Sequence, residues 1–170
     1  MSLHQALTII LNMFKLYLPA MVANATPVFL KQGTPLDTGA KFIDGKRILG
    51  DGKTFEGFAI GLFFGTYTGI VESIILQNTA FLILGLVASI GALFGDILGS
   101  FIKRRLGLKR GEPAPILDQL DFIYGASLAL YVAKAPLTLE IFIVAQIVAL
   151  ILHIVTNRLA FLLKLKPVPW

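Results

Sequence analysis

Cysteine is missing from this chain of 170 residues, and histidine occurs only at His4 and His153. The lack of cysteine excludes disulfide frameworks, thiolate metal sites and cysteine nucleophiles, and two histidines argue against a histidine-built zinc site. Charge is scarce as well. Only 15% of the residues are charged and 56% are hydrophobic, against about 25% and 45–50% in soluble domains. A soluble protein could not bury that much apolar surface.

The apolar residues are gathered in runs of about 20, the length of a helix that crosses a membrane. We therefore predict an all-α, polytopic membrane protein in which residues 1–170 form a single transmembrane domain. Five transmembrane helices are expected, at 3–23, 56–76, 79–102, 117–134 and 138–160.

The basic residues that give the net charge of +5 are unevenly distributed between these spans. Five lie in 24–55, five in 103–116 and three more near the C-terminus, whereas the opposite side holds only Lys134. By the positive-inside rule, the N-terminus lies outside, and the C-terminus and both long basic loops are cytoplasmic. Topology and anionic membrane ligands account for this charge, so no nucleic-acid partner is expected.

Glycines recur every four residues in two of the predicted spans. Because four residues are close to one helical turn, each set forms a smooth stripe along one helix face. The stripe in 79–102 either serves only to pack helices or, near Gly95 and Gly99, also leaves room for a lipid. The two sets are Gly57, Gly61, Gly65 and Gly69, and Gly91, Gly95 and Gly99.

Three acidic residues, Asp96, Asp118 and Asp121, fall within predicted spans at one depth, near the cytoplasmic headgroups. Acids within spans are costly and are functional candidates by default. Asp118 and Asp121, three residues apart, share one helix face. Like charges this close would repel and take up protons unless a cation neutralised them. Mg²⁺ suits that role, because it takes few protein carboxylates and completes its shell with water and substrate phosphates.

Two neighbours of Asp96 extend this candidate site. Ser100 and Lys103 follow it at i+4 and i+7, on the same helix face. An alternative remains, in which the aspartates form ion pairs with Arg104, Arg105 or Lys109 and cap the helix that begins at 117.

The two long basic loops contain residues suited to binding phosphate. The 103–116 loop, KRRLGLKRGEPAPI, combines cations with two flexible glycines. The 45–57 segment, GKRILGDGKTFEG, offers backbone N–H groups, ammonium groups and a hydroxyl beside a helix N-terminus. A merely solvated, positively charged loop is the alternative. The candidate binding residues in the 45–57 segment are Lys46, Gly50, Asp51, Lys53 and Thr54.

Polar residues also lie at the cytoplasmic ends of the first and last spans. Asn24, in a segment with a proline on either side, either caps the helix or contacts a ligand. His153 and Asn157 share one face of the 138–160 helix. They either line a polar cavity or form hydrogen bonds between helices.

Three segments together resemble the CDP-archaeol synthase family, archaeal lipid enzymes related to bacterial phosphatidate cytidylyltransferase. They are PAMVANATP (19–27), GKRILGDGKTFEGF (45–58) and GDILGSFIKRRLGLKRGEPAPILDQLDF (95–122). The resemblance implies a CTP-dependent cytidylyltransferase of the cell membrane, with its active site facing the cytoplasm. It would convert 2,3-bis-O-geranylgeranylglycerol 1-phosphate, an unsaturated archaeal ether lipid phosphate, to its CDP-lipid and release pyrophosphate.

The resemblance also implies roles for individual residues. Mg²⁺ would be bound by Asp96, Asp118 and Asp121, which are then catalytic together with Lys103. The phosphate-binding residues it implies are Lys103, Arg104 and Lys109.

The rival functional class is a small transporter that uses buried carboxylates as an ion relay. A relay would spread its acids through the depth of the membrane, whereas these three lie at one level. We therefore favour the enzyme, with CTP, the lipid phosphate and the membrane as its partners. The chain has few helices to surround a lipid, which leaves a homodimer open.

Overall fold

The computed structural model describes residues 2–30 and 32–165 of the chain. These residues form five α-helices and one short 3-10 helix. All five α-helices begin and end within three residues of the predicted spans. Their bounds are α1 Leu3–Ala25, η1 Thr26–Phe29, α2 Phe55–Ile75, α3 Ala80–Arg105, α4 Leu117–Val132 and α5 Leu139–Leu162.

Four of the helical segments are long and apolar enough to cross a membrane, namely α1 with η1, α2, α3 and α5. The fifth, α4, has 16 residues and is about 24 Å long, shorter than the hydrocarbon core of about 30 Å. The prediction of an all-α architecture with five helices is confirmed, and four of them are candidate spans. That α4 also crosses the membrane stays a prediction.

Helix α3 lies at the centre of the bundle, in contact with α1, α2 and α4. Buried side chains of α1 and α4 make up much of the core, including Tyr17 and Ile123. The Tyr17 hydroxyl lies 2.6 Å from the Ser127 hydroxyl. Because an unpaired hydroxyl inside a membrane is costly, this hydrogen bond fixes how α1 packs against α4.

The glycine stripe of α2 is a helix-packing surface. All four glycines of the stripe are buried. A β-carbon at Gly65 would lie 2.8 Å from the β-carbon of Ser89 on α3, and one at Gly69 would lie 2.7 Å from Cα of Gly85. The two helices therefore approach until their backbones nearly touch, as stripes of small residues allow.

The stripe of α3 packs in the same way, but against α4. A β-carbon at Gly95 would lie 3.1 Å from Cα of Gly125, and one at Gly91 would lie 2.6 Å from the β-carbon of Ala129. At Gly99 it would lie 2.9 Å from the carboxylate carbon of Asp121. The alternative that this stripe leaves room for a lipid is wrong, because α4 fills the space.

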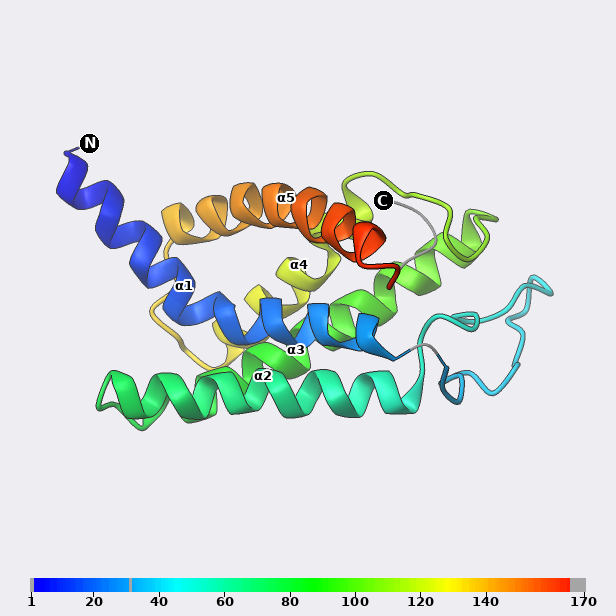
Figure 1. Ribbon diagram of the computed structural model, residues 1–170, viewed down its shortest axis with the longest axis horizontal. Helices are drawn as coiled ribbons and strands as arrows, with labels where there is room; N and C mark the ends of the chain where they lie inside the picture. The colour runs from blue at the N-terminus through cyan, green and yellow to red at the C-terminus, as the bar shows by residue number, and fades with distance from the viewer. Residues whose placement is uncertain (1, 31, 166–170) are drawn as a thin grey trace.

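Figure 1 shows that the two long loops lie at one end of the bundle, together with the C-terminal end of α5. The N-terminus and the short α2–α3 and α4–α5 connections lie at the other end. This arrangement agrees with the predicted placement of both basic loops and the C-terminus on one side. Which side of the membrane that is stays a prediction.

Candidate active site

The first long loop folds back on itself just before α2. The Leu36 N–H donates to the Lys53 carbonyl at 2.8 Å, and Pro35 and Thr54 form an antiparallel bridge. The Thr54 hydroxyl then caps α2 by accepting from the Gly57 N–H at 3.0 Å. This pairing holds the backbone of Lys53 directly in front of the helix N-terminus.

From that position Lys53 reaches the first of the predicted acids. Its Nζ lies 2.5 Å from Oδ2 of Asp96 on α3, and each side chain is about a quarter exposed. Asp121 on α4 lies within electrostatic range of both Asp96 and Lys53. Close packing between α3 and α4 at Gly99 brings the Asp121 carboxylate to the same place.

Asp118, in the first turn of α4, forms the second pair. Its two carboxylate oxygens lie 2.9 and 3.1 Å from Nζ of Lys103, at the end of α3. Oδ2 also accepts from the Ala114 N–H at 2.9 Å. The Lys103 side chain is only 14% exposed, so this ion pair is shielded from water and stronger than one at a surface.

Arg104, Arg105 and Lys109 are the alternative partners expected for the three aspartates. Among the described residues, Arg104, Arg105 and Lys109 form no ion pair with the three aspartates. Arg105 instead holds the first loop: it forms an ion pair with Asp44 at 3.1 Å and donates to the Arg47 carbonyl.

The two basic loops lie side by side. Lys46 Nζ donates to the Arg105 carbonyl at 2.9 Å. A β-carbon at Gly50 would lie 3.4 Å from a guanidinium nitrogen of Arg104, and one at Gly52 would lie 3.9 Å from Arg110 Nε. Cations from both loops therefore gather at the end of the bundle that holds the acids. Phosphate binding by Lys46, Gly50, Lys53 and Arg104 stays a prediction.

Three other predicted site residues have less specific surroundings. Asn24 is half-buried in the last turn of α1, where Thr26 makes a side-chain bond to the helix end by donating to the Val22 carbonyl at 3.1 Å. Ser100 is half-buried on α3, and the Lys109 side chain is exposed. Their roles stay predictions.

Asp37 is the residue that the sequence analysis missed. Its side chain is 1% exposed and accepts from both Nε and Nη2 of Arg47 and from the Gly39, Leu49 and Gly50 N–H groups. The Arg47 guanidinium, helped by these backbone bonds, holds the pKa of Asp37 well below its usual range. Asp51 joins the network through Arg47 at 2.9 Å. The sequence signal was Asp37-Thr38-Gly39, a typical turn, which does not reveal distant partners.

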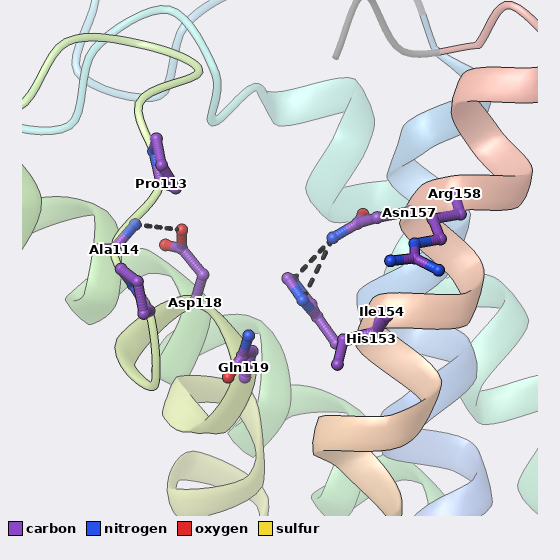
Figure 2. Close-up of a pocket in the computed structure, with 9 residues that line it drawn as sticks. Pro113, Ala114, Asp118, Gln119, His153, Ile154, Asn157 and Arg158 are labelled. Atoms are coloured by element: carbon purple, nitrogen blue, oxygen red, sulfur yellow. Dashed lines mark hydrogen bonds between the residues drawn. The ribbon is translucent and has the colours of Figure 1, made fainter. Parts of the chain in front are cut away.

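A cavity of about 360 Å³ opens beside Asp118, between the start of α4 and the end of α5 (Figure 2). His153 and Asn157 both line it, with an amide–imidazole distance of 3.1 Å. Both residues therefore line a cavity, while hydrogen bonding between helices stays the open alternative for them. Gln119 and Arg158 complete the polar part of the lining.

Mg²⁺ fits the chemistry of these residues. Among residues 2–30 and 32–165, no three His, Asp or Glu side chains are grouped closely enough to hold a metal by themselves. Mg²⁺ does not require three, because one or two carboxylates with water and phosphate oxygens suffice. Asp96 and Asp121 carry such oxygens and lie within electrostatic range of each other, and the Lys53 ammonium at Asp96 shows that a cation is accommodated there. The three-aspartate ligand set stays a prediction.

Comparison with known protein families identifies the chain. Residues 6–170 match the family described as CarS-like: CDP-archaeol synthase. The chain belongs to the CDP-archaeol synthase family. The family resemblance noted in the sequence is thereby confirmed.

Individual relatives agree with this assignment. The chain is 49% identical over 154 residues to a CDP-archaeol synthase of Sulfurisphaera tokodaii, covering 91% of this chain and 92% of the relative. The identity to a CDP-archaeol synthase of Hyperthermus butylicus is also 49% over 154 residues, covering 90% and 92%.

A solved structure has the same fold. It is described as an intramembrane enzyme for archaeal membrane lipid biosynthesis, and it superimposes with a TM-score of 0.81 at 42% identity, covering 85% of this chain and 91% of that chain. The predicted membrane location and the predicted enzyme class, a cytidylyltransferase of archaeal ether lipid synthesis, are confirmed. The transporter alternative is set aside.

Proposed function

We propose that the chain makes CDP-archaeol at the cluster formed by Asp96, Asp118 and Asp121. CMP passes from CTP to 2,3-bis-O-geranylgeranylglycerol 1-phosphate, and pyrophosphate is released. The observation that carries this proposal is the meeting of two acid–lysine pairs, Lys53–Asp96 at 2.5 Å and Lys103–Asp118 at 2.9 Å, where the basic loops join the bundle. The names of the relatives support the choice of substrates.

The reaction needs charge control more than proton transfer. An oxygen of the lipid phosphate attacks the α-phosphorus of CTP, a new P–O bond forms, and the bond to the bridging oxygen of pyrophosphate breaks. The attacking oxygen is already ionised at neutral pH, so no general base is required. Positioning and electrostatic stabilisation then supply most of the rate, as in other phosphoryl transfers.

Lys53 and Lys103 bind the CTP phosphates in this mechanism. Both ammonium groups are partly shielded from water, which strengthens their attraction to anions. As the phosphates draw the lysines away, the oxygens of Asp96 and Asp118 are released. Mg²⁺, for which Asp96 and Asp121 would supply carboxylate oxygens, would neutralise charge on the polyphosphate and the leaving group.

The cavity beside Asp118 is the proposed place for the phosphate head of the lipid. Its lining includes both the cationic side chain of Arg158 and the apolar side chain of Ile154. A phosphate attached to apolar chains matches that combination. The lipid therefore enters between α4 and α5 in this proposal, because the glycine stripe of α3 is closed by α4.

The proposed orientation puts the active site in the cytoplasm and the N-terminus outside. It is supported by the gathering of both basic loops and the end of α5 at one end of the bundle (Figure 1). It requires α4 to act as the fifth span. A homodimer remains a prediction.

The direct test uses protein purified in detergent with CTP, Mg²⁺ and the geranylgeranyl lipid phosphate. We expect a CDP-lipid and pyrophosphate in equal amounts, and none with Asp96→Asn. Asp44→Asn is the matched control, because it removes a carboxylate from a loop ion pair outside the cluster. Equal activity of wild type and Asp96→Asn would refute the assignment of the site.

A further inference from the structure

The buried carboxylate of Asp37 accepts hydrogen bonds from several residues of the first long loop. Five N–H groups point at its two oxygens: Nε and Nη2 of Arg47 at 3.2 and 2.6 Å, the N–H groups of Leu49 and Gly50 at 2.9 Å, and that of Gly39 at 3.2 Å. An ionised carboxylate has about four acceptor sites. Its capacity is therefore filled by protein donors.

The donors to Asp37 belong to the segment that leads into the site. Leu49 and Gly50 lie a few residues before Lys53, and Gly50 is buried with a φ of +82°. On the other side of Asp37, the neighbouring Leu36 N–H donates to the Lys53 carbonyl at 2.8 Å. Asp37 therefore connects the backbone that precedes Lys53, at Leu49 and Gly50, to the backbone that pairs with Lys53, at Leu36.

We propose that Asp37 is a positioning residue, which sets the path of the 47–53 segment and thereby delivers the Lys53 ammonium to Asp96. It does not touch the acids of the cluster. It acts by restricting the loop before CTP arrives, so that Lys53 is already in place for the phosphates. The part of this inference that concerns CTP rests on the proposed function of Lys53.

The substitution Asp37→Asn isolates this role, because the side chain keeps its shape. The amide has one acceptor oxygen in place of two, and its NH₂ group faces N–H donors that it cannot satisfy. Some of the bonds from Arg47, Leu49 and Gly50 are then lost, and the loop opens more often. The matched control is Asp44→Asn, which removes a carboxylate from an ion pair in the same loop, 3.1 Å from Arg105, but leaves the donors to Asp37 intact.

The first readout is the rate at which a water-soluble acylating reagent labels Lys53, measured by mass spectrometry with Lys103 as the internal reference. We expect Asp37→Asn to raise the Lys53 rate about tenfold, the change that corresponds to one lost charge-assisted hydrogen bond. Asp44→Asn should leave the ratio of the two rates near the wild-type value. Equal ratios in the two variants would overturn the positioning role.

The second readout is steady-state kinetics. If Lys53 holds CTP equally in the ground and transition states, Asp37→Asn raises the KM for CTP about tenfold with kcat and the lipid KM little changed. A loop that is only structural would lower the amount of folded enzyme and leave the KM for CTP unchanged. Faster labelling with an unchanged KM for CTP would support the positioning role and refute the assignment of Lys53 to CTP.

A second variant keeps the test decisive should Asp37→Asn fail to fold. Arg47→Gln removes the charged partner but leaves the backbone N–H bonds of Leu49 and Gly50 to Asp37. We expect a smaller rise in Lys53 labelling than for Asp37→Asn, in the same direction. No rise in the folded Arg47→Gln protein would overturn the proposal.

Discussion

Replacing Asp118 by Asn should separate the catalytic role of this residue from its structural one. Asp118 accepts from Lys103 at 2.9 and 3.1 Å and from the Ala114 N–H at 2.9 Å. An asparagine keeps one acceptor oxygen but loses the charge. Asp118→Asn should therefore reduce both activity and stability. The two losses have different causes, which a second substitution, at Lys103, separates.

The loss of stability comes from Lys103. Its side chain is 14% exposed, and that of Asp118 is 26% exposed, so neither charge is well hydrated. Removing the partner of a shielded charge costs about 1–3 kcal/mol, less than the 3–5 kcal/mol typical of a fully buried pair. The double variant Lys103→Gln/Asp118→Asn removes the unpaired cation and should recover most of that loss, giving a coupling energy of about 1–2 kcal/mol.

The loss of activity comes from charge stabilisation in the transition state. One such group typically contributes about 3–4 kcal/mol, or a factor of about 10²–10³ in kcat. The double variant should not recover it, because neither amide can replace the carboxylate or the ammonium. Activity should thus stay at or below that of Asp118→Asn while thermal stability returns.

The assays are CDP-lipid formation across a Mg²⁺ titration and thermal unfolding in detergent, performed on the wild type, both single variants and the double variant. Near-normal turnover of Asp118→Asn at any Mg²⁺ concentration would refute the catalytic role of Asp118. Recovery of both stability and turnover in the double variant would show that the pair only holds α3 against α4.

Three further outcomes are expected. Gly95→Leu should prevent correct folding, since the added side chain meets the α4 backbone; a folded, monodisperse variant with normal KM values would contradict that packing. Arg158→Gln should raise the lipid KM severalfold and leave the KM for CTP unchanged; the opposite pattern would move the lipid phosphate away from the cavity. The lowered pKa of Asp37 means that its contribution to stability is fully present above the ordinary carboxyl pKa and is lost progressively as pH falls from there through the lowered pKa of the folded state. Proteolysis within residues 32–54 should therefore begin to accelerate below about pH 4 in the wild type, but not in Asp37→Asn; equal pH profiles would refute this.

The sequence alone determined the features that depend on nearby residues. Apolar runs and their basic flanks set five helices to within three residues of their observed ends. The i, i+3 spacing of Asp118 and Asp121 and the position of Asp96 near the end of its helix placed the acids at one level. The motifs around them were enough to recognise the family, because these residues lie in short continuous segments.

The tertiary structure decided which partner each acid takes. Lys53 is 43 residues from Asp96, and Lys103 is 15 residues from Asp118. Several cations in the same loops were equally suited by charge and spacing. The choice depends on how the first loop folds back before α2, which no local pattern specifies.

For Asp37 and the glycine stripe of α3 as well, the sequence indicates the local feature and the tertiary structure decides what contacts it. Asp37 lies in an ordinary turn by sequence, and only the folded loop brings Arg47 and the Gly50 N–H to its carboxylate. The spacing of Gly91, Gly95 and Gly99 indicates close approach, but not whether a helix or a lipid fills the space. Helix propensity and hydrophobicity are local properties of a chain, whereas hydrogen-bond partners and steric closure depend on where distant backbone segments meet.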